Sequence, residues 1–404
     1  MAPPAVDRIG PAAPTSDLVS AAGLPAADPA KARDARNRRV HGDIARAADA
    51  PTEVPSLLEL KRKIPAHCFQ PSLLVSLAYV VQDAAIITTL YVIAYWAYNH
   101  LPAALHNWVF LPVFWFFQGF MFWAVFVLGH DCGHGSFSRY PKVNSFVGYM
   151  LHSAILVPFH SWRISHRKHH KNTGNYERDE IFYPIVESEY HGKKNAIARL
   201  VVEELGFMLP LAYPLYLFKG YGHQMTNHSH MDPQSQLFGD EERGMIRTSV
   251  ILWWSMVGFL VTLAAVFGPV FVLNYYVMPY LVYCFWLLMV TFLHHTEPGA
   301  VWYNSSNWDY VKGNLQSIDR VYGIFEYFHH DIGTHVVHHL FPAIPHYRLR
   351  EANRALKPFL GDLHRSSDKA ALPAFFESYD AFRKSYCIPD DTDVFVIPEV
   401  GKKQ

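Results

Sequence analysis

The sequence is short of charged residues and has no surplus of either sign. Asp, Glu, Lys and Arg make up 17% of its 404 residues, whereas a typical soluble domain has about 25%. Lys plus Arg equals Asp plus Glu at 35 each, so the chain lacks the general basic field that attracts nucleic acid. We therefore expect no nucleic acid partner.

Cysteine and cofactor-binding fingerprints are scarce as well. The four cysteines are scattered and form no CxxC pair: Cys68, Cys132, Cys284 and Cys387. They predict no disulfide framework. The sequence also has no glycine-rich flavin or nicotinamide fingerprint and no domain that could enclose a haem. Any electrons that the chain uses must come from another protein.

Apolar residues, by contrast, are abundant: half of the chain is hydrophobic and 15% is aromatic. About 20 apolar residues are enough to cross the hydrocarbon core of a membrane. Three stretches reach that length: residues 76–98, 108–128 and 248–296, the last long enough for two spans with a break near Gly268–Pro269 or Asn274. The fold class predicted is all-α integral membrane, with about four transmembrane helices.

Basic residues predict how these spans are oriented. "KRK" at residues 61–63 precedes the first span, the linker at residues 99–107 has no Lys or Arg, and several basic residues follow the second span: Arg139, Lys142, Arg163, Arg167, Lys168 and Lys171. The positive-inside rule then places both termini in the cytosol. Residues 143–159 and 200–218 are short or interrupted by polar residues, so we expect interfacial or re-entrant helices there.

Composition divides the chain into three parts. Residues 1–54 are rich in Ala, Pro, Asp and Arg and contain no apolar core typical of a secretory signal, so we expect them to be disordered. Residues 55–391 form the membrane domain, and residues 392–404 form a tail. The aspartates of the first part argue against a plastid transit peptide, which is poor in acids, so the endoplasmic reticulum is the expected location and a plastid membrane the alternative.

Three histidine clusters share a helical spacing. His130 and His134 lie four apart, and two trios have i, i+3, i+4 spacing: His166, His169 and His170, then His335, His338 and His339. This spacing places each set on one helical face, and the predicted topology brings all three to the cytosolic end of the bundle, in a cap. Eight imidazoles exceed one tetrahedral zinc and suit two irons that activate dioxygen. A ferritin-like site does not fit, because it needs several carboxylate ligands.

These clusters, "HDCGH", "HRKHH" and "HVVHH", resemble the three histidine boxes of the integral-membrane fatty acid desaturases. The resemblance runs from about Pro55 to Asp391 and includes "IPAHCF", "TFLHH", "SIDRVYG" and "HHLFPAIPHY". Within the family it is strongest with the methyl-end branch. Asp131 and "LFPAIPHY" look like omega-3 enzymes, whereas delta-12 relatives more often carry Glu at the position of Asp131.

The resemblance implies a non-haem di-iron centre whose ligands are the eight histidines of the boxes. It also implies a ninth histidine after the fourth span, for which His295 of "TFLHH" is the candidate. Its neighbour His294 is expected at the membrane interface. Asp131, His329 and His330 are expected to orient the ligands through hydrogen bonds.

The implied activity is the O2-dependent insertion of a cis double bond into a fatty acyl lipid, with two electrons from cytochrome b5 and its NADH reductase or, alternatively, from ferredoxin. An acid–base pair cannot remove hydrogens from unactivated methylenes, so a metal and dioxygen are required. Omega-3 regiochemistry on omega-6 polyunsaturated chains is the expectation. The alternatives are a delta-12 desaturase acting on oleoyl chains, a fatty acyl hydroxylase, and a non-catalytic metal-binding membrane protein.

Overall fold

The computed structural model describes residues 53–189, 210–220, 227–385 and 387–399. The disorder expected for residues 1–54 therefore falls, apart from residues 53 and 54, outside the described residues. The described chain is mostly helical, as expected.

Within the described residues, four helical stretches are long and apolar enough to cross a membrane: Leu73–His100, Ala103–His134, Asp240–Phe267 and Pro269–His295. Their main helices are α3 (Leu73–His100), α5 (Leu111–His134), α10 (Arg243–Phe267) and α12 (Met278–His295). The predicted break in the third apolar stretch is confirmed at Gly268, whose φ of +89° is a left-handed value that favours glycine. Pro269 follows as the first residue of α11 (Pro269–Val272).

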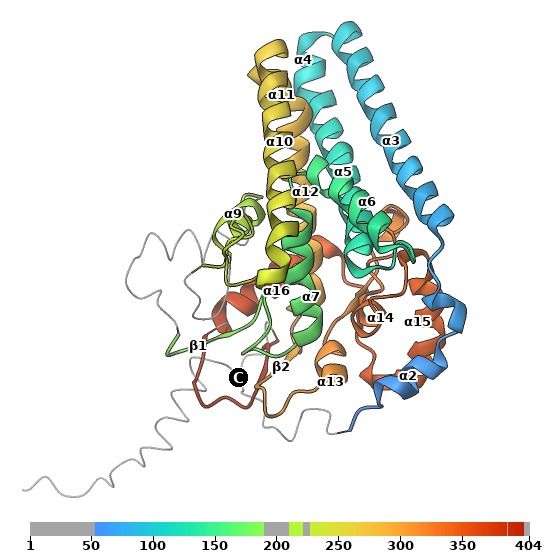
Figure 1. Cartoon of the computed structure of the whole chain (residues 1–404), viewed down its shortest axis with the longest axis vertical. Coiled ribbons are helices and arrows are strands. Elements are labelled where there is room, and N and C mark those ends of the chain that lie inside the picture. The colour runs from blue at the N-terminus through green and yellow to red at the C-terminus, as the bar shows by residue number, and fades with distance from the viewer. Residues whose placement is uncertain (1–52, 190–209, 221–226, 386, 400–404) are drawn as a thin grey trace, which may run out of the picture. The chain divides into compact units, whose positions relative to one another are not determined.

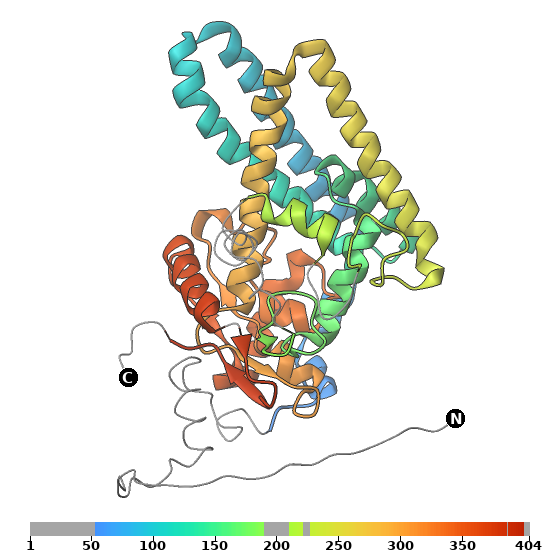
Figure 2. The same cartoon turned by 90° about the vertical axis from the view of Figure 1, so that its left-hand side faces the viewer.

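The four long helices form two hairpins, α3 with α5 and α10 with α12 (Figures 1 and 2). Most of the apolar length of α5 and α12 is buried, whereas little of that of α3 and α10 is buried, so α3 and α10 face lipid. Gly119 allows α5 and α12 to approach closely, because a Cβ atom there would lie 2.4 Å from the Pro279 carbonyl oxygen. The two inner helices thus form the centre of the bundle.

The inner helices each begin with a π-helical segment, η3 (His106–Phe110) before α5 and η7 (Leu273–Val277) before α12. Such segments disturb the regular backbone hydrogen bonds. Side chains from neighbouring helices bond to carbonyls there: Trp115 Nε1 donates to Asn274 (2.8 Å) and the Tyr91 hydroxyl to Tyr275 (3.0 Å). Asn274 is therefore the site of a helix irregularity and not of the break between spans.

Apart from α4, α11 and the two π-helical segments, the remaining described elements surround the histidine-bearing end of this bundle, and we call them the cap (Figure 1). The cap helices are α2 (Leu57–Lys63), α6 (Pro141–Ala154), α7 (Phe159–Asn172), α9 (Ala212–Lys219), α13 (Tyr310–Asn314), α14 (His335–Leu340), α15 (His346–Leu360) and α16 (Ala371–Ser385). Short 3-10 turns join them at Ala66–Phe69, Asp240–Glu242, Gly323–Phe325 and Gly361–Leu363, and α4 (Ala103–Leu105) lies at the far end of the bundle.

The two stretches expected not to span the membrane are short helices where described. The first contains α6, whose 14 residues cover only about 21 Å at about 1.5 Å per residue. The second contains the eight-residue α9, while residues 200–209 lie outside the described part of the chain.

Three small ladders add strands that the all-α prediction did not include. β1 (Ile185–Val186) pairs in parallel with β5 (Cys387–Ile388), and β3 (Asp319–Arg320) in parallel with β4 (Ser366–Ser367). β2 (Val301–Tyr303) pairs in antiparallel fashion with β6 (Val394–Val396). β6 falls in the segment expected to be a tail, so the described part of that segment is attached to the cap.

Candidate metal centre

Four helices present their histidines at the same end of the bundle. α5 carries His130 and His134 in its last turn and ends there, because Gly135 has the left-handed φ of +77° that a glycine accepts without strain. α12 ends at His295, α7 carries the second cluster, and α14 carries the third. The convergence expected from the topology is therefore present.

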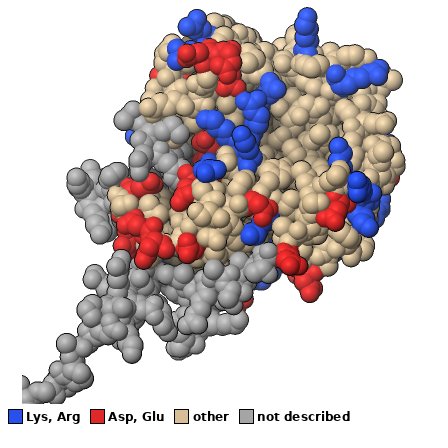
Figure 3. Space-filling view, turned by 60° about the horizontal axis from the view of Figure 1, so that its bottom comes forward, with Lys and Arg blue, Asp and Glu red and all other residues tan. Residues whose placement is uncertain are grey.

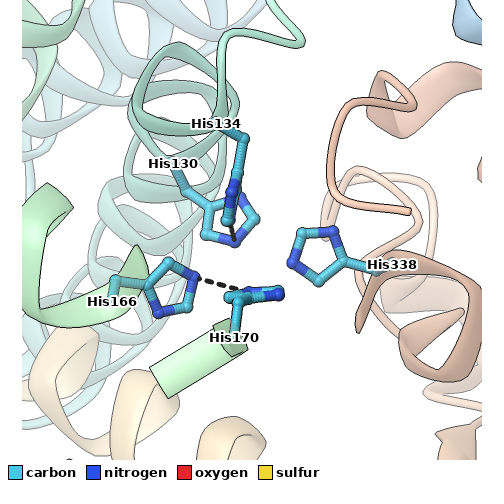
Figure 4. A group of neighbouring side chains, drawn as sticks. All are labelled: His130, His134, His166, His170 and His338. Carbon is cyan, nitrogen blue, oxygen red and sulfur yellow. Dashed lines mark hydrogen bonds between the residues drawn. The ribbon is translucent and has the colours of Figure 1, made fainter. Parts of the chain in front are cut away.

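The first group of side chains contains five histidines whose ligand atoms all lie within 4.8 Å of one another: His130, His134, His166, His170 and His338. Figure 4 shows the five rings turned toward a common centre, with His338 arriving from the side opposite α5 and α7. The Nε2 atoms of His130 and His134 are 3.2 Å apart, and those of His166 and His170 are 3.1 Å apart. We call these five residues the five-histidine group.

The second group contains the other four expected histidines. His169, His295 and His339 offer ligand atoms within 4.8 Å of one another. The fourth member is His335, whose Nε2 lies 3.1 Å from Nε2 of His295. Nε2 of His169 lies 3.3 Å from the same atom. We call this the four-histidine group, and it includes His295 as the resemblance implied.

Both groups fit a metal ion. Two imidazole nitrogens that bind one ion at about 2.1 Å and at right angles to each other lie about 3 Å apart. The four neighbouring Nε2 pairs of the two groups are 3.1 to 3.3 Å apart. Nε2 of His338 and Nε2 of His339 are buried without a hydrogen-bond partner, which is costly unless something binds them. Imidazole ligands suit late first-row metals, including iron.

Burial also keeps the ligands in the form that a metal needs. Desolvation, followed by the neighbouring imidazoles, holds the pKa of His166 and His170 well below the usual 6.5, and the same causes act on the histidines of α14. These rings are consequently neutral at pH 7. A neutral imidazole has a lone pair to offer.

Two rings of the four-histidine group are oriented through their Nδ1 atoms. His169 Nδ1 donates to Oδ1 of Asp179 at 2.7 Å, and both side chains are buried. His339 Nδ1 lies 3.1 Å from both Asn314 Oδ1 and Thr173 Oγ1. In each case Nε2 is left to face the group. Asp179 and Asn314 were not expected from the sequence, because they lie 10 and 25 positions from their histidines with no helical spacing to connect them.

Asp131 makes its principal bonds to a residue that the sequence analysis did not single out. Its Oδ2 accepts from the backbone N–H of His346 at 3.0 Å and from His346 Nδ1 at 2.9 Å. Its Oδ1 is 3.6 Å from Nδ1 of the neighbouring His130, which is longer than a hydrogen bond. Asp131 therefore ties the end of α5 to the start of α15.

The contacts of His329 and His330 do not match the ligand-orienting role expected for them. Among the described residues, neither forms a hydrogen bond with any of the nine histidines. His330 Nε2 donates to Oδ2 of Asp83 on α3 at 2.8 Å. His329 is fully buried, has no hydrogen-bond partner for either nitrogen, and lies against the rings of Phe120 and Trp286.

The expectation that His294 lies at the membrane interface is wrong. Its side chain is fully buried, and its ring stacks on that of His335 with the centroids 4.1 Å apart. Nδ1 donates to the carbonyl of Ile318, and Nε2 lies 3.1 Å from the Tyr322 hydroxyl. His294 thus packs against the ring face of His335, a member of the four-histidine group, and supports its position.

Known proteins match the part of the sequence that carries the two histidine groups. The family described as fatty acid desaturase matches residues 106–368, a segment that contains all nine histidines. The sn-1 acyl-lipid omega-3 desaturase (ferredoxin) of Synechocystis sp. is 47% identical over 329 residues, which cover 81% of this chain and 88% of the relative.

Two plant proteins are similarly close. The omega-3 fatty acid desaturase, endoplasmic reticulum, of Nicotiana tabacum is 46% identical over 316 residues, covering 78% of this chain and 80% of the relative. The sn-2 acyl-lipid omega-3 desaturase (ferredoxin), chloroplastic, of Arabidopsis thaliana is 46% identical over 319 residues, covering 78% and 68%.

Proposed function

Since the chain belongs to the fatty acid desaturase family, we propose that it is a membrane oxidoreductase that inserts the omega-3 double bond into acyl lipids. The observation that carries this proposal is the pair of histidine groups at one end of a four-helix membrane bundle, in a chain whose close relatives are named omega-3 desaturases. We assign the desaturase domain to residues 55–391 and add β6 to it, because β6 pairs with β2.

Two irons are the metals that we propose for the site. One would be held by the five-histidine group and the other by the four-histidine group. Imidazole binds a metal in its neutral form, so nine imidazole ligands would add no negative charge to the pair of ions. Asp179 and Asn314 would fix the direction of two of the rings, His169 and His339.

When bound, the irons would use O2 and two electrons to remove two hydrogens from adjacent unactivated methylenes, and with two protons the oxygen leaves as two molecules of water. The chain's own residues hold and isolate that chemistry. The nine histidines come from four helices that are fixed at one end of a packed bundle, and those of α14 are almost fully buried. Burial excludes bulk water from the ligands.

The acyl chain requires an apolar path to the metals, and we propose that α5 and α12 provide it. The aromatic stretch 114–123 of α5 divides into two kinds of residue. Phe120 and Trp123 are buried near α12 and His329, whereas Phe116 and Phe117 are 37% and 46% exposed. The buried pair is the better candidate for contact with substrate, and the exposed pair faces lipid.

The electron donor is proposed to be a small acidic carrier that docks on the cap. Figure 3 shows Lys and Arg side chains grouped near the middle of the face that includes the cap. Lys171, a basic residue of the cap, is exposed. Opposite charge on a partner favours encounter with such a surface. Cytochrome b5 with its NADH reductase in the endoplasmic reticulum, and ferredoxin in a plastid, are the two candidates, and the named relatives include proteins of both compartments.

The test is expression in yeast that is fed single fatty acids, followed by location of the new double bond by mass spectrometry. Omega-3 products from omega-6 acids support the proposal. A hydroxylated product would assign the site to a hydroxylase, and metal binding without any acyl-dependent oxygen uptake would overturn the enzymatic function. Turnover of the purified protein with each donor in turn identifies the electron carrier.

A further inference from the structure

One very short helix serves both metal groups. α14 has six residues, and it contributes His338 to the five-histidine group and His335 and His339 to the four-histidine group. Helices of this length are not stable in isolation, because the unfavourable free energy of nucleation exceeds the stabilisation from the hydrogen bonds of a single turn. Contacts outside α14 must therefore fix its position.

A carboxylate of the membrane bundle holds the chain just before α14. His330, five residues ahead of His335, donates from Nε2 to Oδ2 of Asp83 at 2.8 Å, and both side chains are at most 1% exposed. Asp83 lies within α3, a candidate membrane span. An ionisable side chain inside a span is costly unless it has a partner, so this pair is a strong anchor for the segment that leads into the third box.

A second carboxylate of the bundle holds the chain just after α14. His346, at the start of α15, donates through both Nδ1 and its backbone N–H to Oδ2 of Asp131 on α5. The rings of His330 and His346 have centroids 4.9 Å apart, and Tyr79 of α3 packs edge-on against both, at 5.5 and 4.6 Å. The two imidazole–carboxylate pairs consequently form one buried layer.

A third carboxylate binds α14 itself. Oδ1 of Asp319 in β3 accepts from the backbone N–H of Val336 at 2.8 Å, and Oδ2 accepts from Asn353 of α15 at 2.7 Å. The first turn of a helix has N–H groups without partners inside the helix. Asp319 satisfies one of them and links α14 to α15.

We propose that the pairs Asp83–His330 and Asp131–His346 are positioning devices, which set the register of α14 between the two metal groups without touching a metal. Because α14 supplies both groups, displacement of it lowers the occupancy of both at once. The identity of the metal as iron rests on the proposed function, whereas the positioning role rests on the contacts of these four residues.

The two pairs use different ring nitrogens. Substitution by glutamine and substitution by asparagine should therefore have opposite effects at His330 and at His346. His330 bonds through Nε2, whose place the amide of glutamine can take, and His346 bonds through Nδ1, whose place the amide of asparagine can take. We expect His330→Gln and His346→Asn to keep the parent's iron content. His330→Asn and His346→Gln should lower iron affinity by about tenfold to a hundredfold. Asparagine also suits the φ of +50° at residue 330, so backbone strain does not explain a loss in His330→Asn.

The readouts are iron per chain in the detergent-purified protein and hydrogen exchange of the amides of α14, with α10, which carries none of these residues, as the internal reference. We expect the disruptive variants to lose iron from both groups together and to exchange faster only around α14. His106→Gln is the matched control, since His106 is buried at the far end of the bundle beside Tyr275. It should keep the iron.

A variant that fails to fold is replaced by Asp83→Leu with His330→Asn, which removes the pair without leaving a buried charge and keeps a residue that suits the φ of +50°. This double variant should fold and show the same loss of iron. Equal iron in all four single variants, or full iron in the double variant, would overturn the positioning role. If no acyl lipid is desaturated but the crossed pattern of metal loss appears, the proposed function fails and the positioning role stands.

Discussion

His169 and His295 bring their Nε2 atoms within 3.3 Å of each other across 126 positions of sequence. The first lies on α7 of the cap and the second at the end of a membrane span. A metal at this point would therefore connect the cap to the bundle, and the loss of either ligand should weaken both the site and that connection.

An alanine substitution in either group should remove one of the two metals. His166→Ala removes one of five ligands from one group, and His169→Ala removes one of four from the other. We expect each to abolish desaturation, because the reaction needs both metals, and to leave membrane insertion intact. Iron per chain should fall by about half in either variant. Retained activity in His169→Ala would exclude the four-histidine group from the reaction.

His295 and His294 should give different results although they are adjacent. His295→Ala removes a ring that lies 3.1 Å from His335 Nε2, so we expect loss of activity and of one iron. His294→Ala removes the ring stacked on His335 together with its hydrogen bonds to Tyr322 and to the Ile318 carbonyl. A partial loss of activity with most of the iron retained is the expected result, and His294→Phe, which keeps the stacking, should recover part of it. Equal effects of the two alanine variants would contradict the assignment.

Asp179 should control the affinity of the four-histidine group. Asp179→Ala removes the acceptor of His169 Nδ1–H, and the ring is then free to turn. We expect about tenfold to hundredfold weaker iron binding, measured by competition with a chelator. The matched control is Asp240→Ala, which removes an exposed carboxylate paired with Arg243 at the start of α10 and should leave iron affinity unchanged.

Substrate feeding should separate the regiochemistries. We expect cells that are given linoleate or arachidonate to make the corresponding omega-3 acids, and cells that hold only oleate to make little linoleate. The reason is the similarity to relatives named omega-3 desaturases, together with Asp131 in the first box. Oleate as the main substrate would make the chain a delta-12 enzyme and leave the metal chemistry unchanged.

Acid should destabilise the metal-stripped protein. Burial lowers the pKa of His329 and of His230 to about 3 from the usual 6.5. The unfolded chain takes up protons near 6.5 and the folded chain does not, so the stability from these rings is complete above pH 6.5 and is lost as the pH falls toward 3. Thermal melting at several pH values measures this. His329→Phe fits the surrounding aromatic rings and should reduce the slope; an unchanged slope would show that His329 does not contribute.

The spans and the histidine clusters could be predicted because their signals are local. A run of about 20 mostly apolar residues predicts a membrane helix, and Gly268–Pro269 is a backbone signal that ends one. The i, i+4 spacing of His166 and His170 likewise places two rings over one centre.

The division of the histidines into two groups could have been predicted from the helical spacing in the sequence, but it was not predicted. On a helix, i and i+4 differ by about 40° in direction and i and i+3 by about 60° on the other side. A trio thus faces two directions. His169 accordingly joins the four-histidine group, while its neighbours on α7 join the other group.

The bonds that orient the ligands could not be predicted, because they join segments far apart in sequence. Asp83 and His330 are separated by 247 positions, and Asp131 and His346 by 215. No periodicity connects such pairs, and only the packed structure brings them together.

The use of α14 by both groups also has a consequence for biosynthesis. The first hairpin and α7 emerge early with His130, His134, His166 and His170, but His338 of α14 is synthesised more than 160 residues after the last of these. The four-histidine group waits for the same segment. Neither group is complete on a nascent chain that stops short of the third box. The proposed irons would therefore find a full set of ligands only after translation has passed α14.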